Sequence, residues 1–484
     1  MFAQSSFTPR FSSYGRPVLG GVLLANALAM AVVFSTPALA QPQAVTFKPT
    51  VFFDTNDKPS GLALGDIDGD GDLDVVVANN SQGALQNGKG GVTVYKNTGN
   101  WNPPSAGFAE RQNYGLDFNS DAPYDVQLAD MDADGDLDIV VTIELRSKVY
   151  ILENDGTGCY WDSPTDCQEG GGGTTNFLVP AIPTDSTTIF SLSVVDINGD
   201  GLKDISIAGS KLTGFPQPVN KPQAEVLWGR ETEGVFDWDV NQPIVVPNFA
   251  GVDIGKGIVT GAFQYPQIKG RIDMAMTLQG TANSATDELV IFRFSNVDIF
   301  PPIWDVYTID GRRGAGLATG VFRTGVEPAV LDLVSTYRHR FDPVLQTAHT
   351  VHIFDNFPNQ PSELFVMQDP VLHALDVDVA SALGKRPYGV ATGCLNGDAR
   401  VDLAVVCPES TASPNAGTLA IFLAHGKQGD FYEPPTFVDV YDDAIQPSKP
   451  CFVKIGDLDQ DGYNDCVVTN WDGGYLAVAI NDGP

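Results

Sequence analysis

The sequence predicts an all-β fold, a seven-bladed β-propeller in which each blade has four antiparallel strands. Three observations support this prediction. An acidic nine-residue motif starts at residues 66, 130, 196 and 457, a β-branched run follows each copy, and an alternating apolar stretch ends each repeat. Glycine (50) and proline (33) are frequent among the 484 residues, which suits many short strands joined by turns. Self-similar units of this length are typical of propeller blades.

The first copy of the motif is Asp66-Ile67-Asp68-Gly69-Asp70-Gly71-Asp72-Leu73-Asp74, and its five carboxylates would repel one another in a compact turn. A bound cation removes that conflict. Calcium takes about six to eight oxygen ligands from carboxylates and backbone carbonyls. We expect side-chain ligands from Asp66, Asp68, Asp70 and Asp74 and a carbonyl ligand from Asp72.

An EF-hand loop opens with the same alternation but needs a bidentate Glu at its twelfth position and a helix on either side. The twelfth position here is Val77, in the β-branched run Val75-Val76-Val77. Such a run favours a strand. The motif is therefore predicted to be a calcium loop between two strands.

The other three copies place ligands at the same positions, with carbonyls expected from Leu202 and Tyr463. Asp and Gly also occur in tight turns without metal, but four copies followed by strands favour about four structural Ca²⁺ sites. The loops span 66–74, 130–138, 196–204 and 457–465, and the further ligands are Asp130, Asp132, Asp134, Asp136, Asp138, Asp196, Asn198, Asp200, Leu202, Asp204, Asp457, Asp459, Asp461, Tyr463 and Asp465.

Three weaker copies complete the series of seven, near residues 262, 321 and 394. Those near 262 and 321 keep the strand–turn–strand pattern and have lost the acidic ligands. The copy near 394 has Cys394 in place of the first ligand and Ala399 in place of the turn glycine. An alternating third strand is predicted in every repeat, at residues 92–97, 149–154, 224–229, 289–294, 350–355, 419–423 and 476–481.

The pattern Gly-Asp-x-Asp-x-Asp-Gly-x-x-Asp, followed by a β-branched strand and later by Val-x-Val-x-x-Asn, resembles the FG-GAP repeats, also called VCBS repeats. These repeats build the seven-bladed propeller of integrin α subunits and of many exported bacterial proteins. The resemblance covers residues 45–484 and implies the same fold with calcium loops between the first and second strands.

Residues 1–40 have the features of a secretory signal. Arg10 and Arg16 precede a largely apolar run over 18–34, and Ala38-Leu39-Ala40 fits a cleavage site. A membrane anchor is the alternative, for which the run is near the lower length limit. Cleavage would leave a single propeller, residues 41–484, in the periplasm, outside the cell or on its surface, with no transmembrane segment. The segment 45–53 is expected to supply the outer strand missing from the last blade.

Six cysteines in an exported chain are most simply paired. Cys159 and Cys167 flank a short loop and are expected to bridge it. Strand direction within the blades predicts Cys394–Cys466 and Cys407–Cys451, because pairing inside one blade would span its opposite ends. Four buried thiols are the alternative.

The charge excludes unaided binding to nucleic acid. Removing residues 1–40 takes away two arginines and no acid, so the net charge becomes −34 instead of −32, and phosphate would be repelled. Residues 251–350 are nearly neutral, with nine basic and ten acidic residues. This stretch could form an anion-tolerant patch, or it could simply have lost its calcium ligands.

The expected function is that of a binding or adhesion module for an extracellular glycan or protein. Ligand contact is expected on the face opposite the calcium loops, where the sequence predicts three variable connections, 208–222, 159–187 and 335–350. The last contains Tyr337-Arg338-His339-Arg340, the predicted ligand-binding residues. The alternative is a calcium-assisted polysaccharide lyase, in which Arg338 would neutralise a uronate and Tyr337 or His339 would move the proton.

Overall fold

The computed structural model describes residues 44–55, 58–80, 91–109, 111–116, 122–160, 182–214, 219–232, 235–246, 252–263, 272–280, 287–296, 303–311, 314–322, 331–337, 351–356, 365–367, 387–408, 417–427, 430–442 and 448–484. The predicted signal segment 1–40 lies outside these ranges. Residues Gln41–Pro484 form one compact unit.

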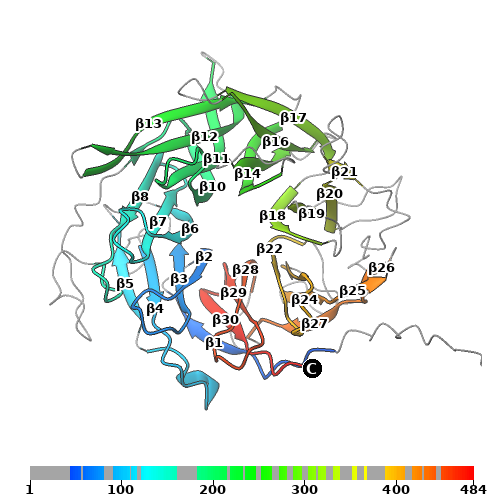
Figure 1. The fold of residues 1–484 in the computed structure, drawn as a ribbon. Helices are drawn as coiled ribbons and strands as arrows, with labels where there is room; N and C mark the ends of the chain where they lie inside the picture. The colour runs from blue at the N-terminus through cyan, green and yellow to red at the C-terminus, as the bar shows by residue number, and fades with distance from the viewer. Residues whose placement is uncertain are drawn as a thin grey trace, which may run out of the picture. The chain divides into compact units, whose positions relative to one another are not determined.

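Seven four-stranded antiparallel sheets make up this unit, as predicted (Figure 1). Blades one to three consist of β2 (Pro59–Gly65), β3 (Asp74–Asn79), β4 (Gly91–Tyr95) and β5 (Gln112–Gly115); β6 (Pro123–Ala129), β7 (Asp138–Ile143), β8 (Lys148–Leu152) and β9 (Ile182–Pro183); and β10 (Thr188–Val195), β11 (Asp204–Thr213), β12 (Val219–Thr232) and β13 (Val235–Val245).

Blades four and five consist of β14 (Val252–Gly261), β15 (Asp273–Gly280), β16 (Asp287–Asn296) and β17 (Ile303–Gly311); and β18 (Gly314–Gly320), β19 (Asp332–Tyr337), β20 (Val351–Asn356) and β21 (Phe365–Met367). Blade six consists of β22 (Val390–Gly393), β23 (Asp402–Cys407), β24 (Thr418–Phe422) and β27 (Thr436–Asp439), with an inserted hairpin of β25 (Ala424–Lys427) and β26 (Asp430–Tyr432). Every predicted third strand is confirmed to within a few residues, except where β12 and β16 extend further.

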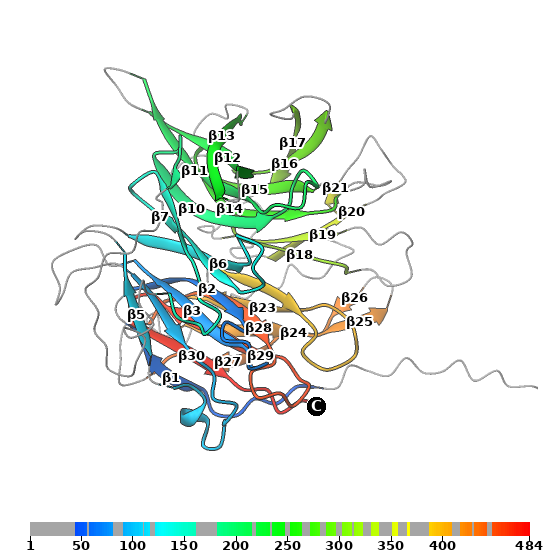
Figure 2. The same cartoon turned by 60° about the vertical axis from the view of Figure 1, so that its left-hand side comes forward.

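The ring closes through blade seven, which combines both ends of the described chain. Its strands are β28 (Pro450–Gly456), β29 (Asp465–Asn470), β30 (Tyr475–Ala479) and β1 (Val51–Asp54), and β1 pairs with β30 (Figure 2). The prediction for segment 45–53 is thereby confirmed. The first strand of each blade contacts that of the next blade, and β28 contacts β2.

The apolar core lies between neighbouring blades, because successive side chains of a strand point to opposite sides. In β23, Ala404 and Val406 pack against blade seven, whereas Leu403, Val405 and Cys407 pack against blade five. The second strands β3, β7 and β29 are accordingly buried along their whole length, and their central residues are mostly apolar.

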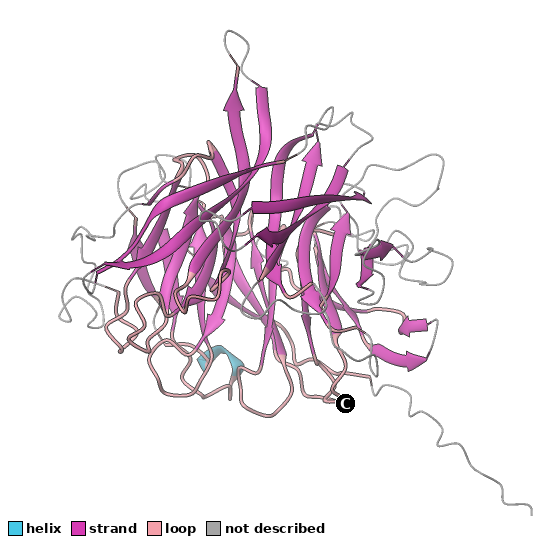
Figure 3. Cartoon of the chain, turned by 45° about the horizontal axis from the view of Figure 1, so that its top comes forward, coloured by secondary structure: helices cyan, strands magenta, loops and turns pink. Residues whose placement is uncertain are grey.

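Close approach of the innermost strands depends on glycine. A Cβ on Gly61 of β2 would lie 2.6 Å from the Cα of Asp125 in β6, nearer than two carbon atoms can come. Most of the described chain is strand (Figure 3), and within it the three-residue 3₁₀ helix η1 (Pro104–Ala106) is the single helix. No helix in the described ranges has the length and apolarity to cross a membrane.

Strand direction divides the ring into two faces. The first-to-second and third-to-fourth strand connections lie on one face, here called the loop face. The second-to-third connections and those between blades lie on the other, the opposite face.

The expected insert 208–222 is on the opposite face and is largely a hairpin extension of β11 and β12, with Thr213 opposite Val219. The connection containing Cys159 follows the third strand β8, so its assignment to the opposite face was wrong. Cys167 lies outside the described residues, and its pairing with Cys159 stays a prediction.

Cys407 and Cys451 are free thiols, so the predicted bridge between them is not formed. Cys407 packs against blade five, and the Cys451 Sγ lies 3.4 Å from the carbonyl oxygen of Pro59 in blade one. Both side chains thus point away from the interface between blades six and seven that the bridge would have to cross. The prediction placed the two residues at the same strand ends but ignored the direction of their side chains.

Cys394 and Cys466 are also free thiols, and this predicted bridge is likewise absent. Their segments are neighbours, since Asn464 Nδ2 donates to the carbonyl oxygen of Cys394 at 2.7 Å. The Cys394 sulfur, however, lies beside the carboxylates of its own loop, whereas Cys466 is fully buried in the apolar core between blades six and seven. The alternative of buried thiols therefore holds for Cys407, Cys451 and Cys466, whereas Cys394 is a free thiol that is only partly buried.

Candidate metal centres

Each acidic loop is a tight turn closed by its own carboxylates. In the first loop, Asp66 Oδ1 accepts hydrogen bonds from the backbone N–H groups of Gly69 at 2.8 Å and Asp70 at 3.1 Å, and Oδ2 accepts one from Gly71 at 3.0 Å. Gly69 and Gly71 have φ of 74° and 94°, in the left-handed region that glycine adopts most easily. The same two positions are left-handed in the other loops, even where Ala133, Gln460 and Ala399 replace glycine.

Carboxylate oxygens converge within three of the four complete loops. Ligand atoms within 4.8 Å of one another come from Asp66, Asp68 and Asp70, from Asp130, Asp132 and Asp138, and from Asp457, Asp459 and Asp465. Among the described residues, three buried carboxylate oxygens in these loops have no hydrogen-bond donor: Asp68 Oδ1, Asp130 Oδ1 and Asp459 Oδ1. Because an unpaired buried carboxylate oxygen is costly, each loop fits a bound cation.

The third loop differs from the other complete loops because Asn198 replaces their second aspartate. Asn198 Nδ2 donates to Asp200 Oδ2 at 2.9 Å, and Asn198 Oδ1 accepts from the Asp200 backbone N–H at 2.8 Å. Asp196 accepts the same backbone hydrogen bonds as Asp66, at 2.6 to 3.2 Å. This loop keeps oxygen ligands, while its amide removes one negative charge.

The last aspartate of the motif has a structural role that the sequence analysis did not identify. Asp74 is fully buried, and its two oxygens accept hydrogen bonds from the N–H groups of Ile67 at 2.9 Å and Asn97 at 2.7 Å. Burial raises the pKa of Asp74 to about 7, although these two hydrogen bonds act in the opposite direction. Asp74 therefore ties its own loop to the segment that follows the third strand.

A buried aspartate occupies this position in all seven blades. Four others make the same pair of backbone hydrogen bonds, at 2.7 to 2.9 Å, namely Asp138, Asp204, Asp402 and Asp465. In blades four and five, Asp273 is 4% exposed and Asp332 is 2% exposed, and Asp332 accepts from the Phe322 N–H at 3.1 Å. These two blades, which are predicted to have lost the acidic ligands, thus keep a buried aspartate at the last position of the motif.

An asparagine after the third strand links each of three loops to the preceding blade. Asn97 Nδ2 donates to the carbonyl of Leu73 in its own loop at 3.1 Å and to that of Leu458 in blade seven at 2.8 Å. Asn154 and Asn481 make the equivalent pairs at 2.7 to 3.1 Å. We call the buried aspartate and this asparagine the Asp–Asn clamp. The asparagine was visible in the sequence only as the end of the Val-x-Val-x-x-Asn pattern.

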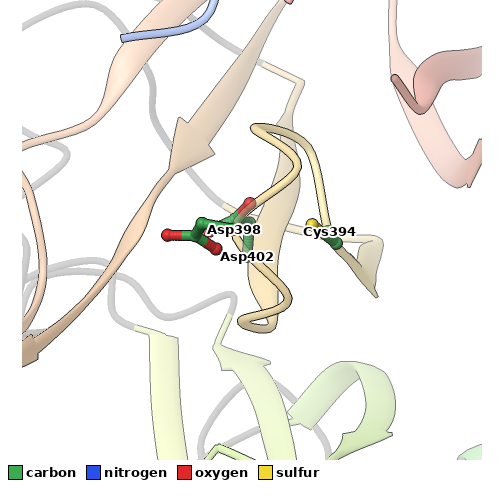
Figure 4. A group of neighbouring side chains, drawn as sticks. All are labelled: Cys394, Asp398 and Asp402. Carbon is green, nitrogen blue, oxygen red and sulfur yellow. The ribbon is translucent and has the colours of Figure 1, made fainter. Parts of the chain in front are cut away.

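The sixth loop does not fit calcium. Figure 4 shows Cys394, Asp398 and Asp402, whose ligand atoms lie within 4.8 Å of one another. The Arg400 guanidinium is 3.2 Å from Asp398 Oδ2 and supplies positive charge inside the loop. Asn396 Nδ2 is buried without an acceptor, and an N–H donor cannot bind a cation.

The predicted ligand-binding residues are not brought into a site by the described structure. Tyr337 is the last residue of β19, which ends on the opposite face as expected. Arg338, His339 and Arg340 lie outside the described residues, so their role stays a prediction.

Comparison with known families agrees with the repeat pattern. A family model described as an FG-GAP repeat matches residues 59–95, and one described as an FG-GAP-like repeat matches residues 130–206. The chain carries FG-GAP repeats. The two matches lie within the first three blades and contain three of the four complete loops, whereas the fourth complete loop, in blade seven, lies outside them.

No curated protein matches the chain. A solved structure described as a crystal structure of BBS1N in complex with ARL6DN, soaked with lead, is similar over 90% of this chain and 98% of that one, with 12% sequence identity and a TM-score of 0.45.

Proposed function

We propose that this FG-GAP propeller is an exported binding module, stabilised by about four Ca²⁺ ions, that recognises an extracellular glycan or protein. The unpaired carboxylate oxygens of Asp68, Asp130 and Asp459 support calcium binding. An ion held in these loops fixes the hairpin between a blade's first two strands. Because it binds the folded state alone, it adds to the stability of the propeller. The signal-like residues 1–40 support export.

The difference between the two faces carries the proposal of ligand binding. The loop face is fixed by Asp–Asn clamps. The opposite face carries the three large exposed apolar side chains found in the described residues, Leu145 (52% exposed), Leu212 (48%) and Val219 (54%). Leu145 lies in the connection between β7 and β8 of blade two, and Leu212 and Val219 lie at the facing ends of β11 and β12, the second and third strands of the adjacent blade three. Exposed apolar side chains on a rigid scaffold are a common feature of recognition surfaces.

An array of immobilised glycans and extracellular proteins tests the proposal. The secreted full chain should be retained by at least one ligand class, and Leu212→Ser combined with Val219→Ser should weaken retention of a protein ligand. Absence of retention on every class would contradict the binding function. Release of unsaturated sugar from a retained glycan would favour the lyase alternative instead.

A further inference from the structure

Six side chains meet across the centre of the ring on the opposite face. They come from five blades, and most lie at or just before the start of an innermost strand, the end remote from the loop face. The set, here called the hub cluster, comprises Tyr124, Phe190, Lys256, Tyr388, Phe452 and Trp471.

Tyr124 of blade two is the centre of the hub cluster. Its hydroxyl lies 3.0 Å from the hydroxyl of Tyr388 in blade six, which is not a ring neighbour of blade two, so the pair spans the ring. Its ring makes edge contacts with Phe190 at 5.3 Å and Phe452 at 6.2 Å, and a tilted contact with Trp471 at 6.3 Å between centroids. Tyr124 is 6% exposed.

Lys256 places a positive charge on this aromatic group. Its Nζ lies 4.2 Å from the ring centroid of Tyr124 and 3.9 Å from that of Phe190, and it donates a hydrogen bond to the Tyr124 hydroxyl. Both distances are within the range of cation–π attraction. The Lys256 side chain is half-buried, as are Tyr388, Phe452 and Trp471, so the cluster offers a partly accessible surface.

The ammonium of Lys256 has no carboxylate partner within 4.0 Å in the described ranges, in contrast to Lys48, Lys96, Lys211 and Lys449, each of which pairs with an aspartate. Asp125, which follows Tyr124 in the sequence, and Glu144, whose charge acts on Tyr124, both accept hydrogen bonds from other groups. Asp125 accepts the backbone N–H groups of Val126 and Leu192, and Glu144 accepts Asn80 Nδ2 at 2.8 Å.

We propose that the hub cluster binds a carboxylate-bearing sugar, a hexuronate unit of an acidic glycan, with its carboxylate on Lys256 and its ring face against Trp471. A half-buried ammonium with N–H donors to spare favours an anionic oxygen, and a charge-assisted hydrogen bond is stronger than a neutral one. The adjacent aromatic surface matches the flat apolar face of a sugar, which an acidic peptide side chain lacks. The nearly neutral stretch 251–350, to which Lys256 belongs, permits the approach of an anion to a strongly acidic protein.

This inference rests on the proposed function and identifies its ligand class and site. Titration calorimetry of the full chain, in buffer with Ca²⁺, should show binding of short oligogalacturonates and none of the neutral galactose oligomers. Lys256→Gln should weaken binding at least about tenfold, the loss expected for one charge-assisted contact. Trp471→Leu should weaken it as well.

Lys148→Gln is the matched control, because Lys148 Nζ also lies over a tyrosine, 5.7 Å from the Tyr150 ring centroid, but on the third strand of blade two. It should bind as the unmodified chain does, and thermal melts verify that each variant is folded. Equal binding by Lys256→Gln would overturn the site, and equal binding of polyglutamate would overturn the sugar. If oligogalacturonates fail while another array ligand is retained, the inference falls and the proposed function stands; if nothing is retained, both fall.

Discussion

Asn154→Ala is expected to lower the free energy of unfolding by about 2–4 kcal/mol. The Asn154 residue is 7% exposed. Its Nδ2 donates to the carbonyl of Ile67 in blade one at 2.7 Å and to that of Leu137 at 3.1 Å, and its Oδ1 accepts the N–H groups of Gly156 and Gly158 at 3.1 and 3.0 Å. The side chain thus joins three segments in two blades.

The magnitude follows from the partners that alanine would leave. Each hydrogen bond contributes about 0.5–1.5 kcal/mol net, and a buried group left unpaired costs about 1–3 kcal/mol. The carbonyl of Ile67 is the partner least able to reach water, because Ile67 is 2% exposed, whereas the exposed loop around Gly156 can rearrange. Two lost bonds and one unpaired carbonyl, each at the low end of its range, give about 2 kcal/mol, and four lost bonds at about 1 kcal/mol each give about 4 kcal/mol.

Urea denaturation of the variant and of the unmodified chain, both with Ca²⁺, measures the difference through the shift of the midpoint. Asn220→Ala, at an exposed position of the β12 hairpin, is the control and should change stability by less than about 0.5 kcal/mol. A shift for Asn154→Ala as small as that of the control would refute the clamp as a stabilising element.

Three further predictions concern the ions and one buried acid. Chelation by EDTA should lower the melting temperature, and about 10 mM Ca²⁺ should restore it with about 1–3 kcal/mol per occupied loop, for dissociation constants of about 10⁻⁴–10⁻³ M; an unchanged melt would contradict calcium binding. Asp68→Ala, which leaves no oxygen ligand at that position, should remove one Ca²⁺ from the total found by elemental analysis, while Asp398→Ala in the sixth loop should remove none. Burial raises the pKa of Glu225 above its ordinary value, so the folded state binds this proton more tightly than the unfolded state. The stability that the protonated Glu225 contributes is therefore fully present below the pKa of the unfolded state and is lost as the pH rises through the pKa of the folded state. A pH series of denaturation curves should therefore show a smaller loss of stability for Glu225→Gln than for the unmodified chain.

The blade count and the course of the chain could be predicted because the repeat fixes them locally. Each acidic motif ends one strand and begins the next, and alternation identifies the third strand without knowledge of its neighbours. The closure of the ring by β1 could be predicted by counting strands, because the last repeat ends after its third strand and β1 supplies the fourth.

Features that depend on side-chain direction or on a second blade could not be predicted in the same way. Cys407 and Cys451 stand at matching strand ends, yet one faces blade five and the other faces blade one, and a register shift between Pro450 and Phe452 precludes simple alternation counting. The hub cluster joins Tyr124 to Tyr388 over 264 residues, and no local pattern indicates such a contact.

The buried aspartate of the clamp creates the electrostatic problem that the acidic loops then solve in different ways. Asp74 is fully buried, and its burial, together with the charges of Asp68 and Asp70 in the same loop, raises its pKa and so disfavours its ionised form. A Ca²⁺ ion would offset this repulsion directly, which is the proposed arrangement in blades one, two, three and seven. Blade six carries its own cation, Arg400, beside Asp398.

Blades four and five lack the alternating carboxylates that repel the buried aspartate in the complete loops. The connections before Asp273 and Asp332, residues 262–272 and 321–331, contain no aspartate, and Glu327 is their single acidic residue, so both lack the alternating carboxylates of the complete loops. The clamp aspartate is thus the common structural element of all seven blades, and the proposed Ca²⁺ ion would be one of three ways to offset its charge. It follows that EDTA should destabilise the ring unevenly, with blades one, two, three and seven losing hydrogen-exchange protection while blades four to six keep theirs. Uniform loss of protection around the ring would show that the cation is needed for the fold of every blade, and would contradict this division.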